Sequence, residues 1–556
     1  MSFQFGHPYE VAPKYEKPVA YFCMEFAIHQ ALKIYAGGLG YLAGSFMRSA
    51  FELRQNVVGV GILWKHGYYN QAKRADGTMD VNFDEKNYNF LQETLIKYTI
   101  RIAGHDVWVT AYYLAPEIFG TAPLFLLTTD LPENDYLAKT TSHKLYDSNP
   151  EASMAAAILL GIGGAKLFEY LDWKPAIYHL NESHGLPLAF YLYSRIGSSA
   201  EVRKRLVFTN HTPEAGGNLK TNVWRLYNMG FFGDASEADV RDITQTNGND
   251  LDHTLSALRL SGIANGVSKA HLKTLFNIWQ SYNNICPIIS ITNAQSFSFW
   301  AAKEMYEAFE RNDPEEMQRL KKKAKQHLFE VVADQTGKIL KEDVFTLVFA
   351  KRFAGYKRAD LLLYNFERFE RIVNNGRYPV QIIWAGKPHP ADYPAIGIFD
   401  KIVHYCRSSQ NCAVLAGYEL SLSKLLKNGA DAWLNVPRMT HEASGTSGMS
   451  AAMNGTVNIS IADGWFPEFA KDKVNCFVIP AADERTGDYE RDAIESNNLY
   501  DLLENSVIPM YYNNKPEWQW LVANGMKEIT PYFDSNRMNN EYYEKLYKYD
   551  PNSYPE

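Results

Sequence analysis

The chain has 556 residues, which is too long for one hydrophobic core, so we expect two large domains. Hydrophobic residues make up 46% and charged residues 21%, as is usual for a soluble globular protein. The net charge of −7, with no dense stripe of lysine and arginine, argues against a nucleic-acid partner. The sequence has no run of about 18 apolar residues, so we predict no membrane span. It also has no signal-peptide pattern, so we predict no export.

The cysteines indicate a reducing compartment. There are five, an odd number, and they are scattered without the paired spacing of a metal site. No short Asp-x-Asp arrangement indicates a divalent metal either. We therefore expect a cytoplasmic protein with no metal site.

Short β-rich runs alternate with helical stretches along the whole chain. Many of these runs are continuously apolar, which is typical of strands buried on both faces of a parallel sheet. The expected strands lie at 57–63, 124–128, 176–180, 205–209, 344–349, 380–384, 413–415 and 432–434, with a helix at 153–171. The pattern predicts an α/β fold, in which ligands bind beyond the carboxyl ends of the strands.

A polar, helical stretch at 297–341 separates the two halves of this pattern, and a fresh strand follows it. We therefore expect an N-terminal domain at 1–295 and a C-terminal domain at 296–524. The last 30 residues are rich in tyrosine and asparagine. We expect a terminal helix at about 525–556 that packs back on the first domain.

A glycine cluster at 35–44 comes just before a predicted helix. Gly37 and Gly38 would let backbone amides approach a phosphate or a sugar oxygen at the positive end of that helix. A plain tight turn has the same composition, so the cluster is weak evidence alone.

Two histidine-containing segments each follow an apolar strand. Asn181 and His184 lie in the first, and His211 lies in the second. A hydrogen-bonded structural histidine at a strand end is the simpler interpretation of either one alone. Their shared position at strand ends favours a ligand site.

Three cations follow the apolar strand at 344–349. Arg352 and Lys357 are five residues apart at a strand-to-helix turn and can converge on one phosphate, with Lys351 beside them. The alternative is a solvated surface cluster. The position of these cations at the carboxyl end of a predicted parallel strand favours phosphate binding over a solvated surface cluster.

The segment 442–455 reads Glu-Ala-Ser-Gly-Thr-Ser-Gly-Met-Ser-Ala-Ala-Met-Asn-Gly. Its glycines allow successive backbone amides to face one anion, forming a nest. The residues expected to contribute are Ser444, Gly445, Thr446 and Ser447.

Together these segments closely resemble the α-glucan phosphorylases of glycogen, starch and maltodextrin, and in particular the short bacterial type. The resemblance runs from about residue 21 to about residue 465. It implies two Rossmann-like domains facing a cleft, the GT-B glycosyltransferase fold. In that family a lysine follows the position of Met449 and holds pyridoxal phosphate as a Schiff base. Here Ser450 takes its place, and a hydroxyl cannot form an imine.

The resemblance also implies roles for the residues named above. His211, Arg352, Lys357 and Glu442 would be catalytic, with His211 and Glu442 holding the donor sugar and the two cations holding phosphate. The glycine loop, Lys351 and the 444–447 loop would bind the donor or its phosphate. The residues expected to bind the sugar or the acceptor are Asn134, Asn181 and His184.

Segments 44–46, 153–157 and 292–296 also depart from the family pattern, so the site looks remodelled around Ser450. The leading hypothesis is a retaining hexosyltransferase that transfers glucose from a nucleotide-sugar donor to a carbohydrate acceptor, without covalent pyridoxal phosphate. One alternative is an α-1,4-glucan phosphorylase with non-covalent pyridoxal phosphate or a substituted lysine. Another is a carbohydrate-binding homologue without activity. Family members are often dimers, and the composition leaves the oligomeric state open.

Overall fold

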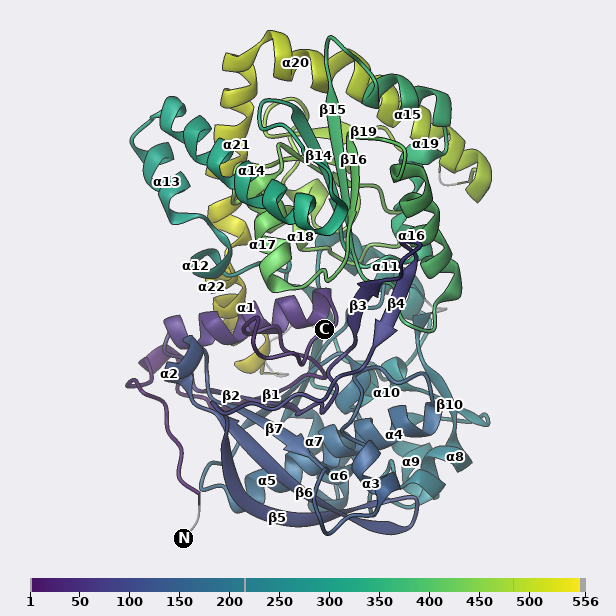
Figure 1. Cartoon of the computed structure of the whole chain (residues 1–556). Coiled ribbons are helices and arrows are strands. Elements are labelled where there is room, and N and C mark those ends of the chain that lie inside the picture. Colours follow the sequence, from purple (N-terminus) through teal and green to yellow (C-terminus); the bar gives the residue numbers. More distant parts are fainter. Residues whose placement is uncertain (1–2, 215–216, 484, 551–556) are drawn as a thin grey trace. The chain divides into compact units, whose positions relative to one another are not determined.

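The computed structural model describes residues 3–214, 217–483 and 485–550 (Figure 1). These residues form two compact units. Unit 1 comprises the described residues of 1–68, 83–293 and 535–556, and unit 2 comprises 69–82 and the described residues of 294–534. The chain changes unit between residues 293 and 294, close to the expected boundary at 296. Residues 69–82 also belong to unit 2, which no feature of the sequence predicted.

Unit 1 contains a nine-stranded sheet with the order β13-β12-β9-β8-β1-β2-β7-β6-β5. The strands from β13 to β7 are parallel, and β6 and β5 continue the sheet antiparallel. The strands are β1 (Val19–Phe22), β2 (Val57–Ile62), β5 (Gln92–Ile102), β6 (His105–Leu114), β7 (Leu124–Thr128), β8 (Ile177–Asn181), β9 (Leu206–Thr209), β12 (Ile263–Gly266) and β13 (Ile288–Ser290). A small ribbon pairs β10 (Lys220–Asn222) with β11 (Asp250–Asp252).

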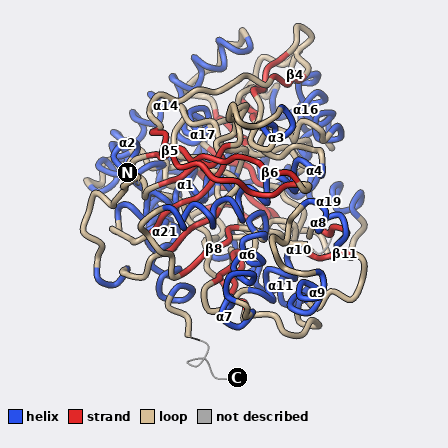
Figure 2. The backbone as a smooth tube through the Cα atoms, turned by 90° about the horizontal axis from the view of Figure 1, so that it is seen from below, coloured by secondary structure: helices blue, strands red, loops and turns tan. Residues whose placement is uncertain are grey.

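Helices flank the strands of the sheets (Figure 2). The helices of unit 1 are α1 (Gly38–Glu52), α2 (Pro116–Phe119), α3 (Tyr136–Thr140), α4 (Pro150–Ile158), α5 (Gly164–Tyr170), α6 (Pro187–Ile196), α7 (Ser199–Arg203), α8 (Val223–Met229), α9 (Glu237–Thr244), α10 (His253–Leu260), α11 (Lys269–Trp279) and α22 (Ser535–Glu541). The expected helix at 153–171 is instead α4 and α5 joined by a π-helical turn, Leu159–Gly163. The stretch Pro150–Tyr170 is long and apolar enough to cross a membrane, but 72% of its apolar window is buried inside the protein, as in a core helix.

Unit 2 contains a six-stranded, fully parallel sheet with the order β16-β15-β14-β17-β18-β19. The strands are β14 (Phe345–Ala350), β15 (Val380–Ala385), β16 (Cys412–Leu415), β17 (Ala432–Asn435), β18 (Val457–Ile461) and β19 (Cys476–Ile479), and a separate hairpin pairs β3 (Asn70–Lys73) with β4 (Met79–Asn82). Every residue of β14 and β15 is buried, because helices cover both faces of such a sheet. The apolar runs therefore predicted a parallel α/β fold correctly.

The helices of unit 2 are α12 (Phe297–Trp300), α13 (Lys303–Glu310), α14 (Pro314–Thr336), α15 (Phe366–Val373), α16 (Tyr393–Cys406), α17 (Leu420–Gly429), α18 (Ser447–Ala452), α19 (Asp488–Leu502), α20 (Ile508–Asn513) and α21 (Lys515–Phe533). The helix α21 belongs to unit 2, and the chain enters unit 1 again only at Ser535. The terminal segment that lies on unit 1 is thus shorter than the 525–556 expected from the sequence.

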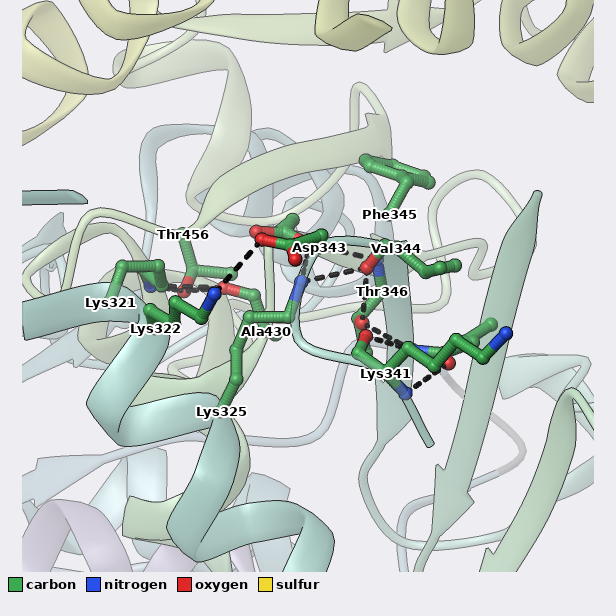
Figure 3. Close-up of polar contacts among 12 residues, drawn as sticks. Lys321, Lys322, Lys325, Lys341, Asp343, Val344, Phe345, Thr346, Ala430 and Thr456 are labelled. Atoms are coloured by element: carbon green, nitrogen blue, oxygen red, sulfur yellow. Dashed lines mark hydrogen bonds and ion pairs between the residues drawn. The ribbon is translucent and has the colours of Figure 1, made fainter. Parts of the chain in front are cut away.

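Two lysines of α14 fasten this helix to the end of the unit 2 sheet (Figure 3). Lys325 forms a buried ion pair with Asp431, at 2.6 Å, and donates to the carbonyl of Val344. Lys321 donates to the carbonyls of Asn428, Ala430 and Asn454 and to the hydroxyl of Thr456, each at 2.9–3.0 Å. These bonds fix the loop after α18, and with it the helix that carries Ser450.

Candidate active site

A cluster of charged side chains lies at the carboxyl end of β14 in unit 2. Lys351 follows the strand directly and donates to the side-chain oxygen of Asn435, at the end of β17. Lys357 lies on a single 3₁₀ turn, Gly355–Lys357, and is paired with the carboxylate of Glu442. Both lysines are buried, with 7% and 9% of their surface exposed, whereas Arg352 is exposed.

The two buried lysines of this cluster differ in how strongly their charged forms are favoured. Burial holds the pKa of Lys351 well below its ordinary value, and the charge of Lys357 lowers it further. Burial also opposes the charge of Lys357, but the pKa of Lys357 is raised overall because Glu442 is paired with it. An anionic ligand would therefore relieve the repulsion at Lys351.

The loop from Glu442 to Ser447 follows this pair. Asp463 fixes its start, because one carboxylate oxygen accepts from the amide of Glu442 at 3.0 Å and the other from Gly464 at 2.8 Å. Burial raises the pKa of Asp463 to about 6. Gly445 has φ of +75°, a left-handed conformation that favours glycine.

The hydroxyls of Ser444 and Ser447 in this loop already have partners within unit 2. Ser444 donates to the carbonyl of Gly445 at 3.1 Å, and the hydroxyl of Ser447 accepts from the Trp433 indole at 3.2 Å. Thr446 is the residue before α18 and caps it without a side-chain hydrogen bond. The loop therefore offers backbone amides, rather than free hydroxyls of Ser444 or Ser447, to a ligand.

Ser450 lies inside α18 and is fully buried. Its hydroxyl donates to the carbonyls of Thr446 and Ser447, both at 3.3 Å, so its hydrogen-bond donor is used by the backbone at the start of its own helix. The side chain of Asn454 donates to the carbonyl of Ser450 at 2.7 Å. The serine thus has no nucleophilic or ligand-binding role in this structure.

The expected anion-binding glycine loop of unit 1 is already occupied by a carboxylate of the protein. The amides of Ala36 and Gly37 donate to one oxygen of Glu25, at 2.6 and 3.0 Å, and Tyr146 donates to the other at 2.7 Å. A β-carbon at Gly40 would lie 2.6 Å from that carboxylate, so the glycine permits its close approach. Gly38, by contrast, is exposed and begins α1.

His211 and Asn181 come together where β8 and β9 end. Nε2 of His211 lies 2.7 Å from the side-chain oxygen of Asn181, so the neutral ring carries its proton on Nε2 and can accept a hydrogen bond at Nδ1. Burial lowers the pKa of His211 to about 3, with smaller effects of His271 and His184. His271 supports the same loop by donating to the carbonyl of Thr212 at 3.1 Å.

Glu182 organises this pair of strand ends. Its carboxylate accepts from the amides of Ser183 and His211, at 3.0 and 2.8 Å. Its own backbone has φ of +72° and ψ of +166°, a conformation found almost only for glycine. Such strain is typical of functional sites, and here it places one carboxylate between both histidine-containing segments.

His184 lines a pocket of about 540 Å³ within unit 1. Aromatic rings from Trp64, Tyr146 and Phe231 and the ring of His253 line the same pocket. Nδ1 of His184 is buried and has no hydrogen-bond partner among the described residues. Burial lowers its pKa to about 4, so it can accept a hydrogen bond from a hydroxyl at neutral pH.

Asn134, which we expected to bind the sugar or the acceptor, has its side-chain amide bonded to the backbone. Its amide accepts from the backbone N–H of Trp108 and donates to the carbonyls of Trp108 and Thr129, at 2.7–2.8 Å. It does not line the pocket of His184. An asparagine two residues from a proline is a common turn residue, and the sequence could not distinguish this role from ligand binding.

Residues 301–507 match the family described as carbohydrate phosphorylase. A maltodextrin phosphorylase of Thermococcus litoralis is 33% identical over 96% of this chain and 71% of its own length. The chain belongs to the carbohydrate phosphorylase family. A glycogen phosphorylase of Aquifex aeolicus is 30% identical over 96% of this chain and 86% of its own length. An uncharacterised protein of Methanocaldococcus jannaschii is 44% identical over 96% of this chain and its own full length.

Sequence reasoning missed several residues that organise these candidate sites. Three carboxylates each accept hydrogen bonds from two backbone amides: Glu25, Glu182 and Asp463. The two amides that Glu182 binds lie in different loops. Glu182 stands between Asn181 and His184, so its position was a signal that could have been used. Glu25 and Asp463 are single carboxylates without a motif, and only the folded chain shows their partners.

Proposed function

We propose that the protein transfers glucosyl residues between an α-glucan and phosphate, as an α-glucan phosphorylase. The observation that carries this proposal is the pair of buried amines, Lys351 and Lys357, at the carboxyl end of β14, where a bound phosphate would favour the protonated form of both. The maltodextrin and glycogen phosphorylases among the relatives support the same reaction. The comparisons thus favour what the sequence placed second to a nucleotide-sugar transferase.

The residues of unit 2 would hold the transferred phosphate. Lys351 and Lys357 would bind it as point charges, Arg352 would add its planar fork, and the 444–447 amides would complete the contact. Fixed positive charge of this kind stabilises the developing charge on a leaving phosphate without reorganisation. Glu442 is held against Lys357, so we assign it first to keeping that lysine charged and in place.

The residues of unit 1 would hold the sugar. The neutral His211 can accept a hydrogen bond from a glucosyl hydroxyl at Nδ1, and Asn181 fixes its ring. The aromatic pocket of His184 has a volume in the range typical of small-ligand sites and would receive the glucan acceptor.

A nucleotide-sugar donor is the second candidate, and Ser450 is the observation that favours it. The serine removes the amine by which the family holds pyridoxal phosphate, so the anion sites of unit 2 would be available to a donor diphosphate. In this case the protein would be a retaining hexosyltransferase that works without pyridoxal phosphate. No metal-binding group of three or more His, Cys, Asp or Glu occurs among the described residues.

A thermal-shift panel separates the candidates. It would contain inorganic phosphate, glucose 1-phosphate, nucleotide diphosphate sugars and a maltooligosaccharide. A ligand at a hundred times its dissociation constant should stabilise the folded state by about 2.7 kcal/mol. A shift with phosphate and glucose 1-phosphate supports the phosphorylase, and a shift with one nucleotide sugar alone supports the second candidate. A response to the maltooligosaccharide alone would contradict both and indicate a carbohydrate-binding homologue without activity.

Two arginine variants test whether the cation cluster carries the binding. Arg352→Ala should remove most of the phosphate-dependent shift if this arginine clamps the anion. Arg371→Ala is the matched control, since Arg371 is an exposed arginine on α15 of the same unit. Equal shifts in wild type and Arg352→Ala would refute the role of Arg352.

A further inference from the structure

Arg358 directly follows the lysine of the Lys357–Glu442 pair, and its backbone has an unusual conformation. It has φ of +51° and ψ of +53°, the left-handed region that a residue with a β-carbon rarely adopts. Its side chain is buried. A conformation of this kind persists only where surrounding contacts hold it, and such residues gather at functional sites. The contacts of Arg358 therefore show what holds the turn that carries Lys357.

The guanidinium of Arg358 joins three segments of unit 2. Nε donates to the carbonyl of Val436 at 2.8 Å and Nη2 to the carbonyl of Pro437 at 3.0 Å, both in the loop after β17. On α19, Nη1 donates to Asp492 at 2.9 Å, and Nη2 forms an ion pair with Glu495 at 2.5 Å. All three nitrogens thus have partners within the protein. The guanidinium is therefore not available as a further cation for a phosphate ligand.

These contacts lie on both sides of the Lys357–Glu442 ion pair. Arg358 is the next residue after Lys357, and Val436 and Pro437 begin the loop that leads to Glu442. One side chain therefore ties the backbone that carries the amine to the backbone that leads to its carboxylate. Its partners on α19 fix both of these segments to a helix.

A second arginine repeats the connection between the same turn and the same loop. The amide of Arg438 donates to the carbonyl of Tyr356 at 2.8 Å. The Arg438 guanidinium pairs with Asp492 at 2.8 Å, so one carboxylate of α19 serves both arginines. Nζ of Lys357 lies 4.8 Å from the centre of the Tyr356 ring. The turn and the loop are thus held together beside the amine that would bind phosphate.

A purely structural ion pair is the simpler explanation of a buried arginine. Arg368 has such a role in unit 2, because it joins α15 to the end of α19 and the residues just after it. It pairs with Asp501 at 2.7 Å and with Glu504 at 2.6 Å. Neither partner lies in the turn or the loop that Arg358 joins. Arg358 differs because it also binds backbone carbonyls next to the lysine cluster.

We propose that Arg358 is a positioning residue for the phosphate site. It holds the amine of Lys357 against Glu442 and does not itself touch phosphate. A cation that is fixed in place stabilises an anion without reorganisation, and a misplacement of about 1 Å can cost a factor of about 100. The inference rests on the proposed phosphorylase function, because that function is the reason for expecting phosphate at these lysines.

The test compares Arg358→Lys with Arg368→Lys in the full chain. Lysine keeps the positive charge, but its single nitrogen cannot reach two carbonyls and two carboxylates together. Both variants should lose stability, because each disrupts ion pairs with two carboxylates. Isothermal titration with inorganic phosphate should give a dissociation constant raised about tenfold or more in Arg358→Lys and changed by less than about twofold in Arg368→Lys.

The kinetics of glucose 1-phosphate formation separate positioning from a merely structural role. In Arg358→Lys the KM for phosphate should rise, whereas the KM for the maltooligosaccharide should stay unchanged. Loss of folded protein alone would lower the apparent kcat and leave both KM values unchanged, and that result would overturn the inference. An equal rise of the phosphate KM in Arg368→Lys would overturn it as well.

Asp492→Asn keeps the inference falsifiable if Arg358→Lys does not fold. This variant leaves both arginines in place and removes the carboxylate that they share. Its phosphate affinity should fall, because the turn and the loop lose their common attachment to α19. Wild-type phosphate affinity in a folded Asp492→Asn protein would contradict the positioning role.

The two proposals can fail separately. Unchanged phosphate affinity in the variants of Arg358 and Asp492, with glucose 1-phosphate formed, would refute the positioning role and leave the proposed function. Weakened phosphate binding in these variants, with no glucose 1-phosphate formed by the wild-type chain, would refute the function and leave Arg358 assigned. A wild-type chain that binds no phosphate would overturn both.

Discussion

At the scale of single residues, the proposed phosphate site of Lys351 and Lys357 buries two amines at a cost in stability. Lys357 is paired with Glu442, whereas Lys351 donates to the neutral amide of Asn435, and the charge of Lys357 opposes its protonation. A residue that burdens the fold in this way is typical of a ligand site, because the ligand supplies the missing counter-charge. The two lysines should therefore respond differently to substitution.

Lys357→Met should destabilise the protein by about 3 kcal/mol or more, because it leaves Glu442 buried without its partner. Lys351→Met should change stability by about 1 kcal/mol or less, because relief of repulsion offsets the lost hydrogen bond. Both variants should lose phosphate binding. Urea denaturation and phosphate titration measure the two effects. Equal destabilisation by both substitutions would contradict this description of the charges.

The buried His179 should make the stability of the folded protein depend on pH. It is fully buried, it donates from Nε2 to the Thr209 hydroxyl at 2.7 Å, and Nδ1 accepts from Tyr547 at 2.8 Å. Burial lowers its pKa to about 3 from 6.5, with a smaller effect of His211. The unfolded chain therefore binds more protons below pH 6.5, and stability falls as the pH drops from 6.5 toward about 3.

His179→Gln keeps one donor and one acceptor but does not titrate. It should lose less stability on acidification, with a slope reduced by up to about 1.4 kcal/mol per pH unit. Urea midpoints of wild type and variant across this range provide the comparison. Parallel pH profiles would show that His179 does not contribute to the acid sensitivity.

The proximity of the residues proposed to bind phosphate could be predicted in part, because they follow the ends of two strands. Lys351, Arg352 and Lys357 follow one strand, and the 444–447 loop follows another. The binding of the Glu25 carboxylate by the amides of the glycine loop could not be predicted, because only the fold brings Glu25 to this loop. Asn134 shows the reverse error, because nothing local shows that its amide is bonded to the backbone.

At the scale of elements, the loop before α18 depends on one glycine. Gly445 has φ of +75°, and a β-carbon there would also lie 3.4 Å from the side chain of Glu442. The conformation of Gly445 therefore affects both the Lys357–Glu442 ion pair and the backbone amides that would bind phosphate. Its geometry should be sensitive to a single methyl group.

Gly445→Ala should cost about 1–2 kcal/mol, because an L-residue is strained in the left-handed region. It should also weaken phosphate binding, since the loop amides would move. Gly397→Ala is the control: Gly397 lies in α16, a β-carbon there meets nothing within 4 Å, and alanine should stabilise the helix by about 0.5–1 kcal/mol. Thermal unfolding and phosphate titration check both. A stable Gly445→Ala protein with normal affinity would contradict the role of this loop.

Element prediction worked best for the strands and least well for the helix at 153–171. Continuous apolar runs predicted the strands because both faces of these sheets are covered. The apolar pattern of 153–171 does not reveal the π-helical turn at Leu159–Gly163, because a change in hydrogen-bond register leaves the composition unchanged.

At the scale of the whole molecule, the chain enters and leaves each unit more than once. The hairpin of β3 and β4 belongs to unit 2, and the residues from Ser535 onward belong to unit 1. A boundary near residue 296 could be read from the composition. The other changes of unit could not be predicted, because the short segments at these points do not have the composition of a linker.

The returning C-terminal segment should be essential for unit 1. Tyr542, Tyr543, Leu546 and Tyr547 are each at least 98% buried. A chain ending at Asp534 should lose these side chains, each worth about 1.5–3 kcal/mol, and unit 1 should unfold or aggregate. A chain ending at Asp550 is the control. Limited proteolysis compares them, and a protease-resistant unit 1 in the shorter chain would contradict this prediction.

The most direct test of the central claim is formation of glucose 1-phosphate from a maltooligosaccharide and inorganic phosphate, with pyridoxal phosphate present. We predict that the wild-type chain forms glucose 1-phosphate and that the Lys351→Met variant, although folded, does not. If the wild-type chain forms none but consumes a nucleotide sugar in the presence of the same acceptor, the phosphorylase assignment is wrong.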